Sequence, residues 1–183
     1  VLGIGNNAVI PIAVDQDNRM DLDALNHTLD DVEGDPESAV MAVIGIAGTT
    51  ETGAVDRLND IADICQEHRI HFHVDAAWGG PVMLSDRYRG LLEGIERADS
   101  ITIDGHKQFY LPMSNGMVFF KEPTAMDAVA YNATYINRPG SVDLGIKSLE
   151  GSRAANSLIL GSALDIMGAG GYAVLIDHGI ETA

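Results

Sequence analysis

Cysteine is nearly absent from this sequence of 183 residues, since Cys65 is the only one. A single thiol excludes an internal disulfide framework and a cysteine-rich zinc site, and it suits a reducing compartment. Basic residues are also scarce, with 11 Lys and Arg against 27 Asp and Glu and a net charge of −16. Because this charge opposes a phosphate-binding surface, we expect no nucleic-acid partner.

Long hydrophobic runs are missing as well. No uninterrupted apolar run reaches the roughly 18 residues that span a bilayer, and the first ten residues lack the basic stretch of a signal peptide. We therefore expect no membrane partner and a cytoplasmic location. Hydrophobic residues still make up 46% of the chain, enough for the core of one domain. The opening at Val1 without a methionine suggests a piece of a longer protein.

The spacing of the apolar residues predicts an α/β fold. Short apolar runs predict strands over residues 8–14, 39–47, 70–74, 100–103 and 117–120. Helical spacing predicts helices over residues 20–31, 56–68, 88–97, 124–131 and 149–167. Asp56 is the expected cap of the second helix, and the glycines of 168–171 are the expected end of the last one. We expect a mainly parallel sheet with helices on both faces and a ligand at the carboxyl ends of its strands.

One polar cluster, HFHVD at residues 71–75, occupies a predicted strand. Side chains alternate along a strand, so His71, His73 and Asp75 share one face and form an array typical of metal ligands. A metal-dependent hydrolase is therefore one hypothesis. A metal site would need a further ligand close by, whereas Ala76 and Ala77 follow. We favour the alternative that both histidines are hydrogen-bonded within the strand, and we expect no metal.

A second cluster, DGHK at residues 104–107, contains one of three lysines. Lys121 and Lys147 lie beside polar segments and are expected to be solvated charges. Lys107 follows a predicted strand and precedes the apolar FYLP segment, which can desolvate the amine and favour its neutral, nucleophilic form.

The two clusters together match the needs of pyridoxal phosphate. This cofactor requires a lysine for its aldehyde, a carboxylate for its pyridine nitrogen and donors for its phosphate. Asp75 ends one predicted strand, and Lys107 follows the next after 107 − 75 = 32 residues, which is room for one crossover. The cofactor ring could then bridge the two strand ends.

Three motifs in order carry a family resemblance: GIAGTTETGAVD at 45–56, HVDAAWGG at 73–80 and IERADSITIDGHK at 95–107. Together they resemble the group II pyridoxal-phosphate-dependent amino-acid decarboxylases, which act on glutamate, aspartate, diaminobutyrate or aromatic amino acids. The resemblance implies part of the large domain of a fold-type I, aspartate aminotransferase-like enzyme. Residues 1–183 would be the C-terminal share of this cofactor-binding domain, without the N-terminal segment and the small C-terminal domain.

The same resemblance implies roles for the residues of the two clusters. Lys107 would bind the cofactor aldehyde covalently, and Asp75 would form a salt bridge with the pyridinium nitrogen. Ala77 would lie under the ring and His106 would contact the phosphate. Asp104 stands where relatives often have asparagine beside the phosphate, and a carboxylate there repels a dianion unless it points away.

Further implied contacts come from other segments. Thr50 would lie near the ring substituents or the substrate carboxylate. Ser152, followed by Arg153, resembles a segment that reaches the phosphate of the neighbouring subunit, where Ser152 would donate at a helix start. Many relatives also have a tyrosine on a mobile loop that donates a proton. Here Tyr135 precedes a loop over 137–150 without an aromatic residue, so the proton donor stays unassigned.

The implied activity is removal of the α-carboxylate of an L-amino acid. GHKQFYLPMSNGMVFFK at 105–121 resembles bacterial decarboxylases of aspartate, glutamate or diaminobutyrate, and on this resemblance alone we favour an acidic amino acid, glutamate or aspartate. L-2,4-diaminobutyrate and aromatic amino acids are the alternatives, and a non-catalytic fragment is an alternative of another class. We expect a homodimer with a shared active site and no activity from these 183 residues alone.

Overall fold

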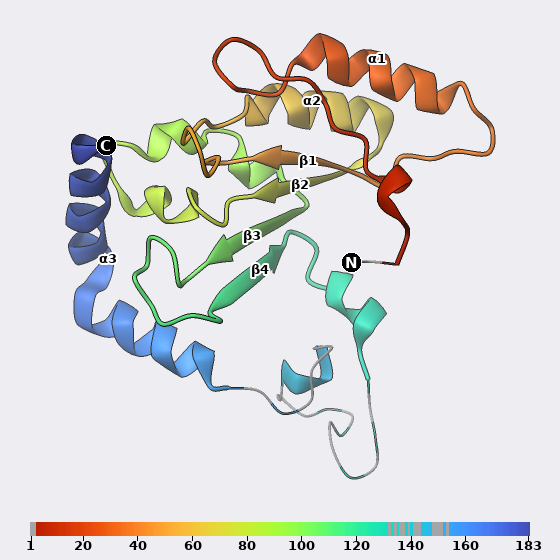
Figure 1. The fold of residues 1–183 in the computed structure, drawn as a ribbon. Helices are drawn as coiled ribbons and strands as arrows, with labels where there is room; N and C mark the ends of the chain where they lie inside the picture. Colours follow the sequence, from red (N-terminus) through yellow and green to blue (C-terminus); the bar gives the residue numbers. More distant parts are fainter. Residues whose placement is uncertain are drawn as a thin grey trace.

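Four strands form one sheet in the order β1-β2-β3-β4 (Figure 1). The computed structural model describes residues 3–131, 133, 135, 138, 140, 144–147, 152 and 154–183. The strands are β1 (Ala42–Ile46), β2 (His71–Asp75), β3 (Ser100–Asp104) and β4 (Gly116–Phe120). β1, β2 and β3 run parallel, and β4 is antiparallel to β3. The predicted α/β class with a mainly parallel sheet is confirmed.

Three α-helices accompany the sheet, namely α1 (Leu22–Glu33), α2 (Leu58–His68) and α3 (Asn156–Thr182). Short 3-10 turns connect them: η1 (Asn6–Ala8), η2 (Gly80–Leu84), η3 (Arg89–Leu92), η4 (Ile95–Arg97), η5 (Ala125–Val129) and η6 (Leu144–Lys147). Asp21 caps α1 by accepting hydrogen bonds from two backbone N–H groups of the first turn. Arg69, with a left-handed φ of 56°, ends α2 and allows the turn into β2.

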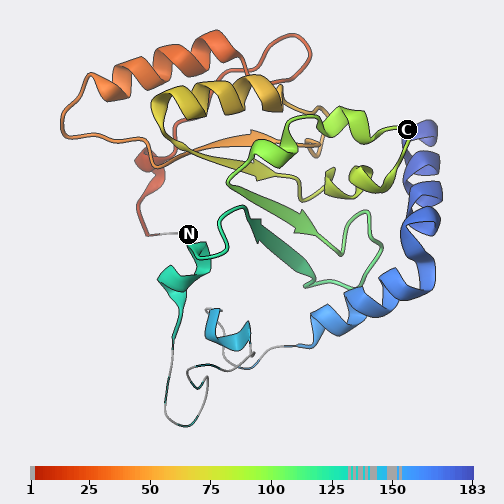
Figure 2. The same ribbon diagram turned by 180° about the vertical axis from the view of Figure 1, so that it is seen from behind.

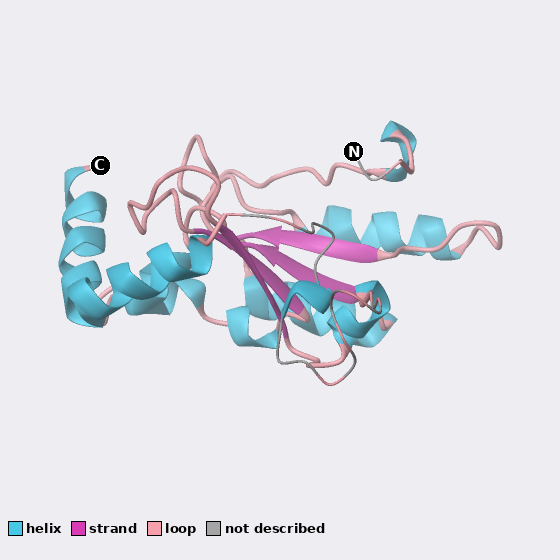
Figure 3. Ribbon diagram, turned by 90° about the horizontal axis from the view of Figure 1, so that it is seen from below, coloured by secondary structure: helices cyan, strands magenta, loops and turns pink. Residues whose placement is uncertain are grey.

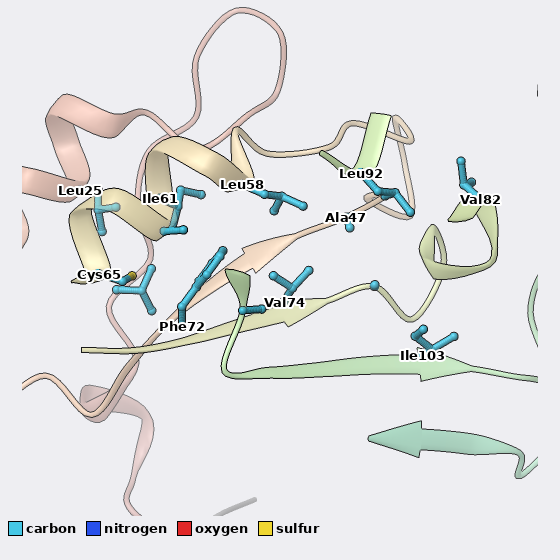
Figure 4. Close-up of a cluster of buried hydrophobic side chains, with 14 of the residues drawn as sticks. Leu25, Ala47, Leu58, Ile61, Cys65, Phe72, Val74, Val82, Leu92 and Ile103 are labelled. Atoms are coloured by element: carbon cyan, nitrogen blue, oxygen red, sulfur yellow. The ribbon is translucent and has the colours of Figure 1, made fainter. Parts of the chain in front are cut away.

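The hydrophobic core lies between the sheet and α2. Leu58, Ile61 and Cys65 from α2 are buried in one cluster with Phe72 and Val74 from β2 (Figure 4). The cluster also includes Leu25, Leu29, Val43, Ala47, Val82, Leu92 and Ile103. Burial raises the pKa of the Cys65 thiol to about 11, so Cys65 is a small core side chain and not a reactive thiolate.

The opposite face of the sheet is open in the described part of the chain. We expected helices on both faces, but α1 and α2 lie side by side on the same face (Figures 1 and 2). The open face carries Ile44, which is 54% exposed, and Phe120, which is 38% exposed. The remaining open-face positions in β2 and β3 are polar, and they carry the site described below.

The N-terminal strand prediction is wrong. Between residues 8 and 14 the structure has a single bridge, from Val14 to Met20, and no strand. Pro11 lacks the N–H group that a ladder needs, and this segment does not join the sheet. The cap prediction for Asp56 is also wrong, because Arg57 occupies the N-cap of α2. The Asp56 carboxylate instead accepts the N–H groups of Met20 and Ile46, at 2.6 and 2.7 Å.

Three helix predictions differ in kind or in extent. Residues 88–97 and 124–131 form 3-10 turns and not α-helices. The range of α3, Asn156–Thr182, consists of two helices joined at a kink, because Gly168 is non-helical with a φ of 63° and a ψ of 171°. The first of them ends at the glycines that we expected, and a further helix, which the spacing did not predict, follows to Thr182. Residues 149–151 lie outside the described residues.

Helix α3 stands beyond the end toward which the three parallel strands point (Figure 3). Within the described part of the chain, α3 is the one helix that is both long enough and apolar enough to cross a membrane by length and composition, although little of it is buried. We expected no membrane-spanning segment because we required an uninterrupted apolar run, and Asp165 and Asp177 interrupt the apolar residues of α3. Its second half is tied to the domain, since Ser85 donates a hydrogen bond to Asp177 and Arg87 pairs with Glu181.

Candidate active site

The carboxyl ends of β2 and β3 bring Asp75 and the DGHK cluster together. Asp75 is paired in register with Thr102, and the N–H of Asp104 donates to the carbonyl of Ala77 at 3.2 Å. Ala77 therefore lies between the two clusters. Its own N–H donates to the Asp75 carboxylate at 3.0 Å, which fixes one carboxylate oxygen at the end of β2.

Lys107 is oriented by an ion pair. Its Nζ lies 3.0 Å from Asp104 Oδ2, and the two side chains are 34% and 20% exposed. The partial exposure leaves the amine within reach of a ligand, while Asp104 determines where the amine points. Among the described lysines, Lys121 is exposed and Lys147 pairs with Asp127 at 2.6 Å, away from this cluster.

His106 shares the same carboxylate. Its Nδ1 lies 3.0 Å from the carbonyl oxygen of Asn115, and a carbonyl only accepts, so Nδ1 carries the proton. Its Nε2 faces Asp104 Oδ2 at 3.6 Å. Asp104 thus points toward two nitrogen groups of its own chain, the Lys107 amine and the His106 imidazole.

The Lys107 loop is held in place by residues that the sequence analysis missed. The Asn115 carbonyl accepts the Gly105 N–H at 2.7 Å. A Cβ atom on Gly105 would lie 2.6 Å from Asn115 Oδ1, so a side chain at this position would require Asn115 to shift. Tyr172 of α3 donates to the Phe109 carbonyl at 3.2 Å, and the two rings meet edge to face at 5.1 Å. The sequence offers no local signal for Tyr172, which is 63 residues from Phe109.

The remaining predicted site residues lie on other segments. Thr50 is exposed on the loop that follows β1, at the same end of the sheet as Asp75. This loop is closed by the N–H groups of Gly48 and Thr49, which both donate to the Ala54 carbonyl at 3.0 Å. Ser152 is exposed ahead of α3, and Arg153 lies outside the described residues.

The histidines of the HFHVD cluster contact hydroxyl groups. His71 and His73 both lie within hydrogen-bond distance of Ser100 on β3. Among the described residues, no group of three or more His, Cys, Asp or Glu side chains is arranged to hold a metal ion. The geometry therefore favours the hydrogen-bonded interpretation of these histidines over the metal-dependent hydrolase.

A cavity of about 330 Å³ borders Lys107 on the side of α3. It is lined largely by apolar residues, among them Val82, Leu92 and Ile176, and Asp75 does not take part. The side-chain oxygen of Gln108, also on its wall, is buried without a hydrogen-bond partner in the described part of the chain. An acceptor in this state is suited to a donor from a bound group.

The donor set fits pyridoxal phosphate. An accessible primary amine, a carboxylate held at a strand end and an imidazole meet at one end of the sheet. These are the groups that the aldehyde, the pyridine nitrogen and the phosphate of this cofactor require.

Comparisons with known proteins agree with this donor set. Residues 2–183 match the pyridoxal-dependent decarboxylase conserved domain. The chain is 46% identical over 183 residues to an aspartate 1-decarboxylase of Aliivibrio fischeri, covering 100% of this chain and 33% of that protein. It is 34% identical over 186 residues to an L-2,4-diaminobutyrate decarboxylase of Acinetobacter baumannii, covering 99% of this chain and 36% of that protein.

A solved structure shares the fold as well. The crystal structure of mouse CSAD in apo form superposes with a TM-score of 0.90 at 31% identity. The superposition covers 98% of this chain and 38% of the mouse chain. The 183 residues thus span between about a third and two fifths of the length of the relatives compared.

Proposed function

The chain belongs to the pyridoxal-dependent decarboxylase family, and we propose that the complete protein removes the α-carboxylate of an L-amino acid as carbon dioxide, with pyridoxal phosphate as its cofactor. The observation that carries the proposal is the meeting of Lys107 and Asp75 at adjoining ends of β2 and β3. We also propose that the 183 residues alone are inactive, because they span only about a third of the length of the relatives that they match.

An acidic amino acid is the substrate that we propose. Support comes from the relative with 46% identity, an aspartate 1-decarboxylase, which matches the whole chain. L-2,4-diaminobutyrate is the second candidate, supported by a relative with 34% identity. A competition assay with both amino acids on the purified complete protein distinguishes them by the ratio of kcat/KM.

Each residue of the site has a defined task in this proposal. Asp104 orients the Lys107 amine, and this amine would hold the cofactor through its aldehyde. Asp75 would hold the protonated pyridine nitrogen by a charge-assisted hydrogen bond. His106, whose Nδ1 proton is taken up by the Asn115 carbonyl, would donate from Nε2 to the phosphate when its ring is doubly protonated. When bound, the cofactor supplies an electron-withdrawing ring that takes up the electron pair left by the departing carboxylate.

The test replaces the nucleophile. In the complete protein, Lys107→Ala should lose the cofactor that borohydride fixes covalently, together with nearly all turnover. Lys121→Ala is the matched control, since Lys121 is exposed at the end of β4 and should keep both. If Lys107→Ala still yielded a borohydride-fixed adduct, another residue would be the nucleophile and the proposal would fail.

We also propose a homodimer whose subunits share each site. Support comes from the exposed Ser152 ahead of α3 and from the likeness of residues 151–153 to a segment that crosses to the partner subunit. Two inactive full-length variants, Lys107→Ala and Arg153→Glu, are mixed under conditions of subunit exchange. A shared site restores activity, because one site of the heterodimer then has both native residues. No recovery after proven exchange would mean that the segment serves its own subunit.

A further inference from the structure

Two asparagines bind each other's backbone segments, where the Lys107 loop returns to the sheet and where α3 begins. Asn115 Nδ2 lies 3.1 Å from the carbonyl oxygen of Asn156. The side-chain amide of Asn156 donates in turn to the carbonyl of Ser114. Because carbonyl oxygens only accept hydrogen bonds, both side chains present their NH2 groups. We call Asn115 and Asn156 the asparagine pair.

The side chain of Asn156 does not serve helix α3. Asn156 is the first residue of α3, and Ala155 at the N-cap makes no side-chain cap hydrogen bond. Asparagine is also a poorer helix former than alanine. The Asn156 amide instead reaches a segment 42 residues earlier in the chain. It therefore acts between two segments and not within the helix.

The segment that Asn156 holds needs support from outside. Ser114 has a φ of 69°, in the left-handed region that residues with a side chain rarely adopt. Such a conformation persists where surrounding contacts determine it. Asn115, which follows, is 3% exposed, so its polar groups depend on partners within the protein. The asparagine pair supplies a contact at each of these two residues.

The backbone carbonyl of Asn115 carries this support to the site. It lies 3.0 Å from His106 Nδ1, and it also accepts the backbone N–H groups of Gly105 and His106, at 2.7 and 3.3 Å. The imidazole is thus tied at one nitrogen. Its second nitrogen, Nε2, lies 3.6 Å from Asp104 Oδ2, the oxygen that also binds the Lys107 amine. A shift of the Asn115 carbonyl would therefore change where Nε2 points.

We propose that Asn156 is a positioning residue for His106. Through the backbone of Ser114 and Asn115, it holds the imidazole in the orientation from which Nε2 meets the cofactor phosphate. The inference rests on the role of His106 in the proposed function. It predicts that loss of the Asn156 amide weakens the hold on the phosphate, while the lysine amine and the carboxylate at the end of β2 stay in place.

The test uses Asn156→Ala in the complete protein with its cofactor. Because the variant lacks one hydrogen bond, we expect the cofactor to dissociate about three- to tenfold faster, as measured by absorbance after dilution. At saturating cofactor, kcat should stay within about twofold of the wild type. Ser157→Ala is the matched control, since Ser157 is exposed in the same turn of α3 and should change neither. Thermal melting checks that both variants are folded, and Asn156→Ser, whose hydroxyl is too short to reach the Ser114 carbonyl, repeats the measurement.

A double-mutant cycle separates positioning from a merely structural role. Asn156→Ala is combined with His106→Ala, which removes the imidazole. If Asn156 acts through His106, its loss should change the release rate by less than about twofold in this background, because no ring is left to orient. An unchanged release rate in Asn156→Ala alone, or a full additional effect in the double variant, would overturn the proposal.

A second measurement depends on neither release nor turnover. The phosphorus NMR shift of the bound cofactor reports the surroundings of its phosphate. This shift should move in the same direction in Asn156→Ala and His106→Ala, and it should not move in Ser157→Ala. A phosphorus shift that changes in His106→Ala and stays at the wild-type value in Asn156→Ala would contradict the positioning role.

Failure of this inference can be told apart from failure of the proposed function. If His106→Ala releases the cofactor at the wild-type rate, His106 does not hold the phosphate and the inference falls, whereas loss of the borohydride-fixed adduct in Lys107→Ala still supports the function. If Lys107→Ala keeps that adduct, the proposed function fails, while a non-additive cycle still assigns Asn156 to His106.

Discussion

The two faces of the sheet differ more than their shared strands would suggest. In β2, Phe72 and Val74 are buried against α2, whereas His71, His73 and Asp75 alternate with them on the open face. One five-residue strand thus contributes both to the core and to the site. The period of two along a strand separates the two tasks, so the parity of a position predicts whether a substitution affects stability or chemistry.

The largest effect is expected on the open face. Asp75→Asn should lower kcat a thousandfold or more, on the order of 4 kcal/mol, because a neutral amide cannot hold the pyridinium proton by a charge-assisted bond. The melting temperature should change little, since asparagine can still accept from the Ala77 N–H. Steady-state kinetics and calorimetry on the same preparation check both parts. A large loss of stability would contradict the assignment of the open face to chemistry and of the covered face to stability.

The opposite result, a loss of stability with little change in kcat, is expected for a substitution on the covered face of the sheet. Phe72 is 2% exposed, so Phe72→Ala should destabilise the fold by about 3–5 kcal/mol through lost burial and a cavity. Urea unfolding measures this loss. In the fraction that remains folded, kcat should stay within a few-fold of the wild type. A selective collapse of kcat with normal stability would contradict the assignment of this face to the core.

A smaller effect is expected at the end of the sheet, outside both faces. Tyr172→Phe removes the hydrogen bond to the Phe109 carbonyl and should cost about 1 kcal/mol. Because Phe109 lies two residues after Lys107, the variant should also release the cofactor faster, as measured by dilution and absorbance. Tyr131→Phe is the matched control, since Tyr131 is 64% exposed. Equal behaviour of the two variants would show that Tyr172 does not anchor the loop.

The smallest effect concerns His68, whose pKa is raised, whereas burial lowers the pKa of His73. A hydrogen bond that His68 Nδ1 donates to the Glu33 carboxylate, at 2.8 Å, raises the pKa of His68. The resulting stabilisation is fully present below the unfolded pKa of about 6.5 and is lost as the pH rises through the higher folded value. His68→Gln should therefore be less stable than the wild type near about pH 5, and the gap should narrow by about pH 9. Urea unfolding at both pH values measures it, and a constant gap would exclude the pair as its cause.

The sequence predicted the elements whose pattern is local. The helices near 20–31 and 56–68 and the strands near 39–47, 70–74, 100–103 and 117–120 are all present, because apolar periodicity reflects burial directly. The segment 8–14 failed because a strand needs a partner, and composition does not reveal one. The break at Gly168 in α3 agrees with the local preference of glycine, whereas the helix that follows it to Thr182 was not predicted, because it depends on packing against the rest of the domain.

The site was predictable only in part for the same reason. Lys107 and Asp75 each follow a strand, and parallel strands end at one edge, so their meeting could be inferred from order alone. The link from Ser100 to His73 depends on the register of two strands, 27 residues apart, which no local pattern encodes. Asn115 and Tyr172 likewise act through backbone groups that only the folded chain brings near.

Asp56 has a further consequence for how this chain behaves in solution. Its N–H donates to the Ile46 carbonyl at 2.9 Å, and its carboxylate accepts the Ile46 N–H at 2.7 Å. A single residue therefore occupies both backbone groups of Ile46 in β1, a strand paired on only one side within the described sheet, as a neighbouring strand would. A free strand edge can recruit a strand of another molecule, so this carboxylate guards the end of β1 against aggregation.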